Sequence, residues 1–170
     1  MKTLYVVRHA KASWDNKFLT DYERPLTDTG IQDANSIGDY CNTKKYIPEC
    51  VLSSSAKRTT QTADILIQKI SKKNIKILTD KSLYGASVNE TLNILHAFDN
   101  SINQLMIVGH NPTTTMIINE ISDSRIDHVP TTGVAIIKFD IKKWADLKNQ
   151  GMLIEFIFPK KLCKLTGNEN

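Results

Sequence analysis

Short apolar segments alternate with helical segments along the whole chain, and this alternation limits the possible fold more than any other feature of the sequence. The expected strands are 4–7, 51–53, 75–78, 105–108, 134–139 and 153–158. The expected helices are about 29–42, 56–71, 89–98 and 112–121. Strands that are apolar throughout and separated by helices are typical of parallel sheets covered on both faces. We therefore predict a three-layer α/β/α fold in which a mainly parallel sheet ends in antiparallel strands, because only a short segment joins the last two.

The length of 170 residues corresponds to one domain. We expect the single domain to cover residues 1–170, with its motifs between about 4 and 139 and a basic, polar tail at 160–170. The net charge of +4 is spread along the chain, so we expect no nucleic-acid partner. No apolar run reaches the roughly 20 residues of a membrane helix, and the first apolar segment is too short for a signal peptide. We therefore expect a cytoplasmic monomer that does not bind membranes.

The chain has three cysteines, and they form no CxxC pair. No cluster of histidine, cysteine and carboxylate residues has the spacing of metal ligands. A glycine-rich phosphate loop and a dinucleotide fingerprint are also missing. The sequence thus predicts neither a metal site nor a cofactor.

Three expected strands end in residues that are typical of an anion site. The first strand ends in Arg8 and His9, the helix after the second begins near Arg58, and the fourth is followed by His110. Parallel strands end at the same edge of a sheet, and ligands of such folds bind outside that edge. We therefore expect these two arginines and two histidines to converge on one anionic ligand.

Arg58 occupies a place where a cation is unfavourable. If Ser55 is the N-cap, Arg58 lies in the first helical turn, where the helix dipole disfavours a positive charge by about 0.3–1 kcal/mol. A bound phosphate would remove the conflict by accepting hydrogen bonds from both the helix and the guanidinium. Arg58 is therefore expected to serve a ligand. With Asn111 as N-cap and Pro112 at the first helical position, His110 would likewise precede a helix N-terminus, which lowers the pKa of an imidazole.

Each of these residues, taken alone, has an ordinary structural interpretation. Arg58 could be a surface cation, His110 a loop histidine bonded to the backbone, and His9 a packed residue at the end of a strand. These interpretations do not explain why all of them fall at one edge of the sheet. His96 and His128 have no comparable neighbours in the sequence, and we expect both to be structural or surface residues.

The motifs resemble those of the histidine phosphatase superfamily. R-H-A at 8–10, S-x-A-x-R-x-x-x-T-A at 54–63 and G-H-N-P at 109–112 are similar to the family's R-H-G, S-x-x-x-R and late G-H. R-P-L-T at 24–27 with Gly30, and L-Y-x-A-S at 83–87, resemble the short branch that contains the bacterial phosphohistidine phosphatases. The resemblance extends over about residues 4–139.

The resemblance implies that His9 is the nucleophile and is transiently phosphorylated. It also implies that Arg8, Arg58 and His110 hold the phosphoryl oxygens, with Arg24 as a further phosphate ligand. A nucleophilic His9 must present an unprotonated ring nitrogen, so its other nitrogen should donate to a backbone carbonyl. The implied activity is a metal-independent phosphatase that acts on phosphohistidine in proteins.

Two alternatives stay open. One is a broad phosphomonoesterase for small or activated phosphates, and the other is a non-catalytic module that binds phosphoryl groups. The presence of Arg8, His9, Arg58 and His110 argues against the binding module, because binding alone does not require a nucleophile.

One region departs from the family pattern. Many members carry a glutamate after the third strand as proton donor to the leaving oxygen, whereas residues 83–87 contain no carboxylate. The nearest carboxylate, Glu90, is expected to be a first-turn helix residue that complements the dipole. The sequence therefore predicts poor hydrolysis of alkyl phosphates, whose leaving group needs a proton.

Overall fold

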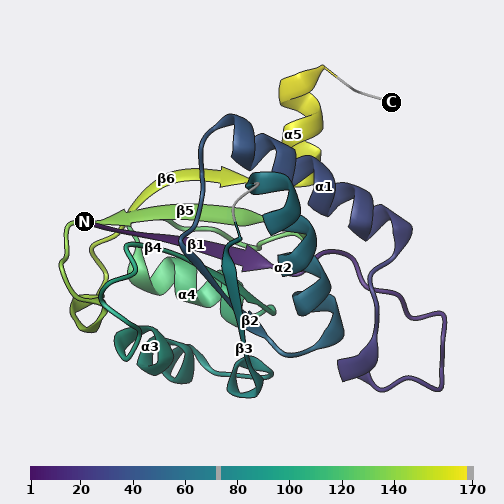
Figure 1. Cartoon of the computed structure of the whole chain (residues 1–170), viewed down its shortest axis with the longest axis horizontal. Coiled ribbons are helices and arrows are strands. Elements are labelled where there is room, and N and C mark those ends of the chain that lie inside the picture. Colours follow the sequence, from purple (N-terminus) through teal and green to yellow (C-terminus); the bar gives the residue numbers. More distant parts are fainter. Residues whose placement is uncertain (72–73, 168–170) are drawn as a thin grey trace.

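The computed structural model describes residues 1–71 and 74–167, and its centre is a six-stranded sheet in the order β3-β2-β4-β1-β5-β6 (Figure 1). The strands are β1 (Lys2–Arg8), β2 (Cys50–Ser54), β3 (Lys76–Asp80), β4 (Gln104–Gly109), β5 (Val134–Phe139) and β6 (Met152–Ile157). Strands β3, β2, β4 and β1 are parallel, whereas β5 is antiparallel to both β1 and β6. The predicted mainly parallel sheet with an antiparallel edge is confirmed.

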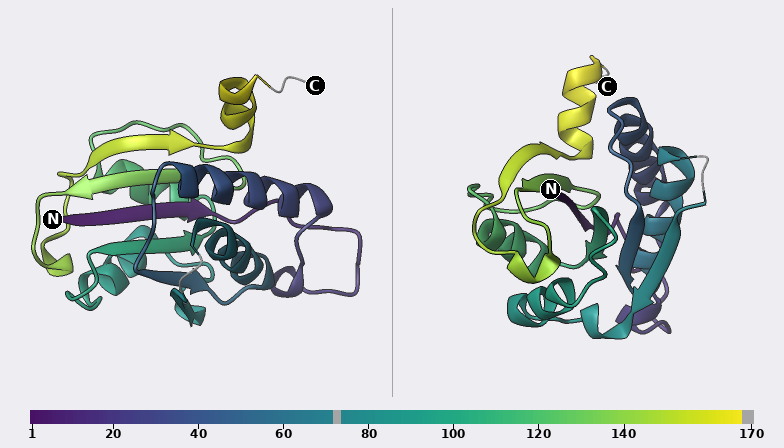
Figure 2. Two further views of the ribbon diagram at one scale, coloured as in Figure 1. Left: turned by 45° about the horizontal axis from the view of Figure 1, so that its top comes forward. Right: turned by 60° about the vertical axis from the view of Figure 1, so that its left-hand side comes forward.

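Helices cover both faces of the sheet, which gives the predicted three layers (Figure 2). The α-helices are α1 (Asp28–Thr43), α2 (Lys57–Ile70), α3 (Val88–His96), α4 (Thr113–Ile121) and α5 (Pro159–Thr166). Short 3-10 helices are η1 (Asp21–Glu23), η2 (Lys81–Leu83) and η3 (Trp144–Asp146). Helix α1 packs along α2 and also contacts α5, while α3 packs against α4 on the other face.

The central strands are apolar throughout because they bury side chains on both faces. Leu4 and Val6 of β1 belong to the cluster that α3 and α4 cover. Tyr5 and Val7 of the same strand belong to the cluster that α1 and α2 cover. Burying one such aliphatic or aromatic side chain contributes about 1.5–3 kcal/mol, so the alternating strand stabilises both layers at once.

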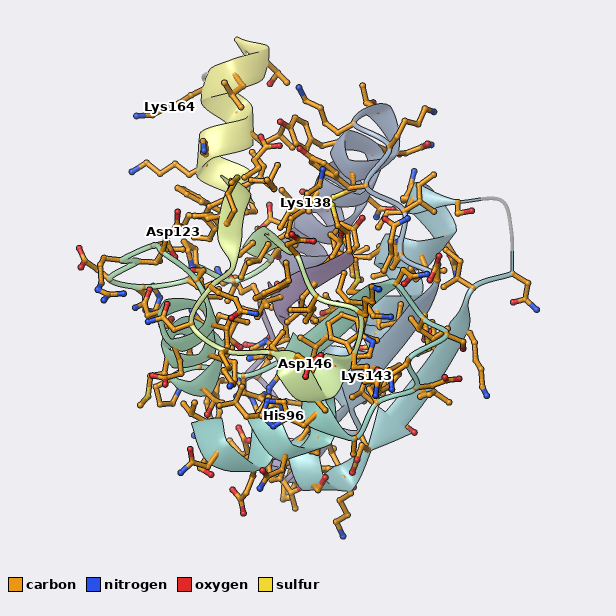
Figure 3. All side chains as sticks on the ribbon, turned by 90° about the vertical axis from the view of Figure 1, so that its left-hand side faces the viewer. His96, Asp123, Lys138, Lys143, Asp146 and Lys164 are labelled. Atoms are coloured by element: carbon orange, nitrogen blue, oxygen red, sulfur yellow. The ribbon has the colours of Figure 1, made fainter. Side chains whose placement is uncertain are left out.

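The expected tail is partly wrong, because residues 159–166 form helix α5. Pro159 is well suited to the first helical position, and Gly167 ends the helix with a φ of 71°. Leu162 is buried against the cluster under α1 and α2, while the side chain of Lys164 points outward (Figure 3). One buried leucine among several lysines is too weak a pattern to predict a helix. Residues 168–170 lie outside the described part of the chain.

No helix within residues 1–71 and 74–167 combines the length and the apolar character needed to cross a membrane.

The register of the parallel strands brings the candidate site residues to one edge of the sheet. In their register Arg8 pairs with Gly109, and Ser53 pairs with Val108. The segments that follow β1, β2 and β4 therefore begin side by side.

Candidate active site

The residues that follow these three strands converge as the sequence predicts. The imidazole rings of His9 and His110 lie with their centroids 5.3 Å apart. The Nε atom of Arg58 lies 3.3 Å from Nε2 of His9. Arg8 is the last residue of β1 and directly precedes His9. One edge of the sheet thus carries two imidazoles and two guanidinium groups.

His9 is held in one tautomer. Its Nδ1 atom lies 2.7 Å from the carbonyl oxygen of Ala10, and a carbonyl can only accept, so Nδ1 carries the proton. The lone pair is then on Nε2, which accepts from Arg58. Burial, together with the positive charges of Arg58, Arg8 and Arg24, lowers the pKa of His9 to about 4 although the bond to Ala10 opposes the shift. His9 is therefore neutral near pH 7, with the backbone contact that a nucleophilic imidazole requires.

His110 is also neutral, but for a different reason from the one predicted. Its Nε2 atom lies 2.9 Å from Oγ of Ser54. Burial is the main cause that lowers its pKa to about 3, followed by the charge of Arg58. Helix α4 begins only at Thr113, three residues after His110. Asn111 is not its N-cap, since the Asn111 amide donates to Val129 O at 3.0 Å.

The start of α2 also differs from the prediction. Ala56 is the N-cap and offers no side-chain acceptor, while the Ser55 hydroxyl accepts from Tyr22 at 2.7 Å. Arg58 does lie in the first turn and is only 6% exposed. Its NH1 group donates to the backbone oxygen of Asp21, and NH2 donates to Oδ2 of the same residue at 3.0 Å. Asp21 thus offsets the unfavourable helix dipole at Arg58.

Asp21 connects the cationic groups of the site, and sequence reasoning missed it. Besides Arg58, its carboxylate accepts from Arg24 NH1 and from the Tyr84 hydroxyl, each at 2.8 Å. Burial alone would raise the pKa of Asp21. The hydrogen bonds from Arg24 and Tyr84 and the charge of Arg58 outweigh that effect and lower the pKa to about 2. The only local signal in the sequence is a carboxylate three residues before Arg24.

Arg24 lies at the edge of this network. Its Nε donates to Ser13 O at 2.8 Å, NH2 donates to Ala12 O at 3.3 Å, and the guanidinium stacks 3.2 Å from the ring centre of Trp14. Its charge is near enough to lower the pKa of His9. Arg24 therefore anchors the loop that follows β1, and its role as a phosphate ligand stays a prediction.

Arg8 has a neighbour that the sequence did not indicate. Its NH1 group lies 3.0 Å from Nε2 of His128 and donates to Val129 O at 2.9 Å. His128 is thus not a lone surface histidine but fixes one end of Arg8.

His96 is structural, as expected, because Nε2 lies 2.9 Å from Leu147 O. Figure 3 views the molecule from the side where β1 begins and shows His96 there, opposite the edge that carries the site.

Three buried polar atoms beside the site have no hydrogen-bond partner in the part of the chain that the structure describes. They are Nε of Arg8, Nδ1 of His110 and Oγ1 of Thr132. Thr132 lies close to His9, since its N–H donates to His9 O at 3.2 Å. It also has a φ of 60°, a conformation that costs a β-branched residue about 1–3 kcal/mol. Polar atoms of this kind would be satisfied by an oxyanion that accepts hydrogen bonds at the site.

Glu90 has the predicted helical role. Its carboxylate accepts from the N–H and hydroxyl of Ser87, each at 2.8 Å, and its own N–H donates back to Ser87. This is a capping box at the start of α3.

Between residues 1 and 167, with 72 and 73 excepted, no group of three or more His, Cys, Asp or Glu side chains could hold a metal ion.

Comparisons with known proteins agree with this geometry. The model of the histidine phosphatase superfamily (branch 1) matches residues 4–88. An uncharacterized protein of Mycobacterium tuberculosis is 28% identical, and the match covers 84% of this chain and 92% of that protein. A chloroplastic, uncharacterized protein of Arabidopsis thaliana is 28% identical over 65% of this chain, which spans only 54% of the plant protein.

Solved structures show the same architecture. A crystal structure from Agrobacterium tumefaciens, provisionally assigned as the phosphohistidine phosphatase SixA, has a TM-score of 0.78 and 27% identity. The alignment covers 93% of this chain and 98% of that one. The protein histidine phosphatase SixA complexed with tungstate has a TM-score of 0.79 over 94% of this chain and 99% of that one, and at 20% identity it supports the fold alone.

Proposed function

The chain belongs to the histidine phosphatase superfamily and is a phosphatase of that family, and from this premise we propose that it dephosphorylates phosphohistidine in proteins through a phosphohistidine intermediate on His9. The observation that carries the proposal is the state of His9. Its Nδ1 proton is held by Ala10, and its unprotonated Nε2 faces the guanidinium of Arg58. This arrangement supports a nucleophilic role for His9 with Arg58 as the charge-neutralising group.

In the first step the lone pair of His9 Nε2 forms a bond to phosphorus, and the bond between phosphorus and the leaving nitrogen breaks. The electron pair goes to the leaving imidazole, which takes up a proton. Arg8 and Arg58 neutralise the oxygens of the transferred group, as in other in-line phosphoryl transfers. Water then attacks the phosphorylated His9, and phosphate, a proton and free His9 are released.

The position of Asp21 suits Arg58 to this role. Asp21 occupies the two terminal nitrogens of the guanidinium, so the Nε edge is the one that faces His9. A phosphoryl group on Nε2 would lie against that edge and accept a charge-assisted hydrogen bond from the Nε–H group. His110 is neutral without ligand, and the negative charge of a phosphoryl group would favour its protonated form.

The leaving group decides between phosphohistidine and phosphate esters. An alkoxide leaves as the conjugate base of a very weak acid and needs a proton delivered as the bond breaks. The carboxylate of Glu90 is engaged with Ser87, so it is poorly placed to deliver that proton. Imidazole has a reference pKa of about 6.5 and can be protonated from solvent near neutral pH. The site is therefore better suited to P–N than to alkyl P–O cleavage.

The test is to measure kcat/KM on one enzyme preparation with a phosphohistidine peptide, an aryl phosphate and an alkyl phosphate such as phosphoserine. We expect the order phosphohistidine, aryl, alkyl, with at least about 100-fold between first and last, the lower range of general acid catalysis. Equal efficiency on alkyl phosphates would contradict the proposal and favour the broad phosphomonoesterase. A loss confined to alkyl phosphates in Glu90→Gln would identify Glu90 as a proton donor.

A further inference from the structure

A cavity of about 580 Å³ adjoins the candidate active site on the side of His110. The strands β1 and β4 contribute Val6 and Ile107 to its lining, and the segment from Leu83 to the first turn of α3 contributes a wall. The first turns of α4 form a second wall of the cavity. Its volume lies in the range of ordinary ligand sites. His110 lines this cavity and its ring also lies beside that of His9, so the cavity adjoins the site.

Several polar side chains of the lining are used within the protein. Thr113 donates to Ala86 O at 2.6 Å, and Thr114 donates to His110 O at 3.0 Å. Ser87 and Glu90 are bonded to each other in the capping box. The surface left for a ligand is therefore mainly apolar.

The larger apolar side chains of the lining come from five elements, β1, η2, α3, β4 and α4. They are Val6, Leu83, Val88, Ile107, Met116 and Ile117. Met116 is 54% exposed and lies on the outer part of this lining. The carboxylate of Glu90 also disfavours a second anionic group here. The cavity is thus suited to an apolar group next to the phosphoryl group, not to another phosphate.

Exposed aromatic side chains also lie in the loop between β1 and η1, where Trp14 contacts Arg24. Trp14 is 72% exposed and stacks on Arg24, and Phe18 in the same loop is 98% exposed. Figure 1 shows this loop, between β1 and η1, extending from the body of the molecule. A small phosphate in the cavity would leave these aromatic rings uncovered. The surface of a protein could cover both the rings and the cavity.

We propose that the cavity beside His110 binds an apolar side chain close to the phosphohistidine of the substrate protein, and so selects among phosphohistidine sites; this inference rests on the proposed function. The phosphoryl group would lie between His9 and Arg58, and the apolar side chain would enter between α3 and α4. Hydrophobic pockets discriminate by about 10-fold or more for small changes in the group they hold.

The experiment uses phosphohistidine peptides that are serine-rich and differ only by one leucine, placed in turn at each position near the phosphohistidine. We expect one position, or two on the same side, to raise kcat/KM by at least about 10-fold over the parent peptide. In Met116→Lys, which places a charge in the lining, that preference should fall to within about 3-fold. Met116→Gln, a neutral change, should give an intermediate preference.

Met152→Lys is the matched control, because Met152 is 62% exposed but lies on β6, outside the cavity lining. It should keep the full leucine preference. Circular dichroism and thermal melts of all variants would show that they fold. Equal preference in Met116→Lys and Met152→Lys would overturn the proposal.

Free phosphohistidine separates the two proposals. If the enzyme hydrolyses free phosphohistidine but no leucine position matters, the cavity proposal fails and the proposed function stands. If neither free nor peptide phosphohistidine is hydrolysed, the proposed function fails. If Met116→Lys instead impairs aryl phosphates with large apolar groups and leaves peptides unaffected, the cavity is a small-molecule site and the proposal is overturned.

Discussion

Replacing Arg58 with Gln should destabilise the protein even in buffer without phosphate. The side chain of Arg58 is 7% exposed and that of its partner Asp21 is 43% exposed. Exposed ion pairs contribute about 0–1 kcal/mol, whereas breaking a buried pair costs about 3–5 kcal/mol. This half-buried pair, with its additional bond to the Asp21 backbone, should contribute about 2 kcal/mol. Removing a cation from the helix N-terminus stabilises the helix by about 0.5 kcal/mol, so the free energy of unfolding should fall by about 1.5 kcal/mol in total.

The assay is urea and thermal unfolding at pH 7 in phosphate-free buffer. For a chain of this size the expected loss corresponds to a fall in Tm of about 3–6 °C. Lys57→Gln is the control, because Lys57 also lies in the first turn of α2 but is exposed. It should be neutral or slightly stabilising, by up to about 0.5 kcal/mol.

The dependence on pH gives a second measurement of the same pair. The pKa of Asp21 is about 2, below its ordinary value of about 4. The stabilisation is therefore complete above about pH 4 and is lost as the pH falls through about 2. The difference between wild type and Arg58→Gln should shrink across this window. If Arg58→Gln is as stable as Lys57→Gln at pH 7, the ion pair contributes nothing, and the reasoning from the structure is wrong.

Four further predictions concern catalysis and the ionisation of His9. His9→Ala should fold and lose at least about 1,000-fold in turnover. In the wild type, brief reaction with labelled substrate followed by an alkaline quench should leave base-stable label on His9. Label found only on another residue would exclude His9 as the nucleophile. Because burial lowers the pKa of His9 to about 4, kcat/KM for an aryl phosphate should decline only near pH 4, and a decline centred near 6.5 would contradict this state. The same shift means that the folded protein binds fewer protons than the unfolded chain between about pH 6.5 and 4, so the free energy of unfolding should fall as the pH drops through that range. Activity should persist in EDTA and be inhibited by vanadate, whereas loss on chelation that one divalent ion restores would show a metal requirement.

The sequence by itself determined the layered sheet and the group of residues at its edge. Apolar segments alternating with helices can bury both sheet faces only in a layered arrangement, and parallel strands necessarily end at one edge. For this reason the convergence of His9, Arg58 and His110 follows from their positions directly after strands. The family resemblance also predicts that one ring nitrogen of His9 donates to a backbone carbonyl, whereas the structure shows that this nitrogen is Nδ1.

The tertiary structure decided which polar groups hold these residues in place. Ser55 and Asn111 are good N-caps by local preference, but Tyr22 and Val129 bind them instead. Asp21 reaches Arg58 across 37 residues, and His128 reaches Arg8 across 120. Partners so distant leave no periodic signal in the sequence, since hydrogen bonds between loops depend on where the folded sheet places them. The candidate catalytic residues could therefore be identified from their local positions, whereas the network around Asp21 that contacts them could not.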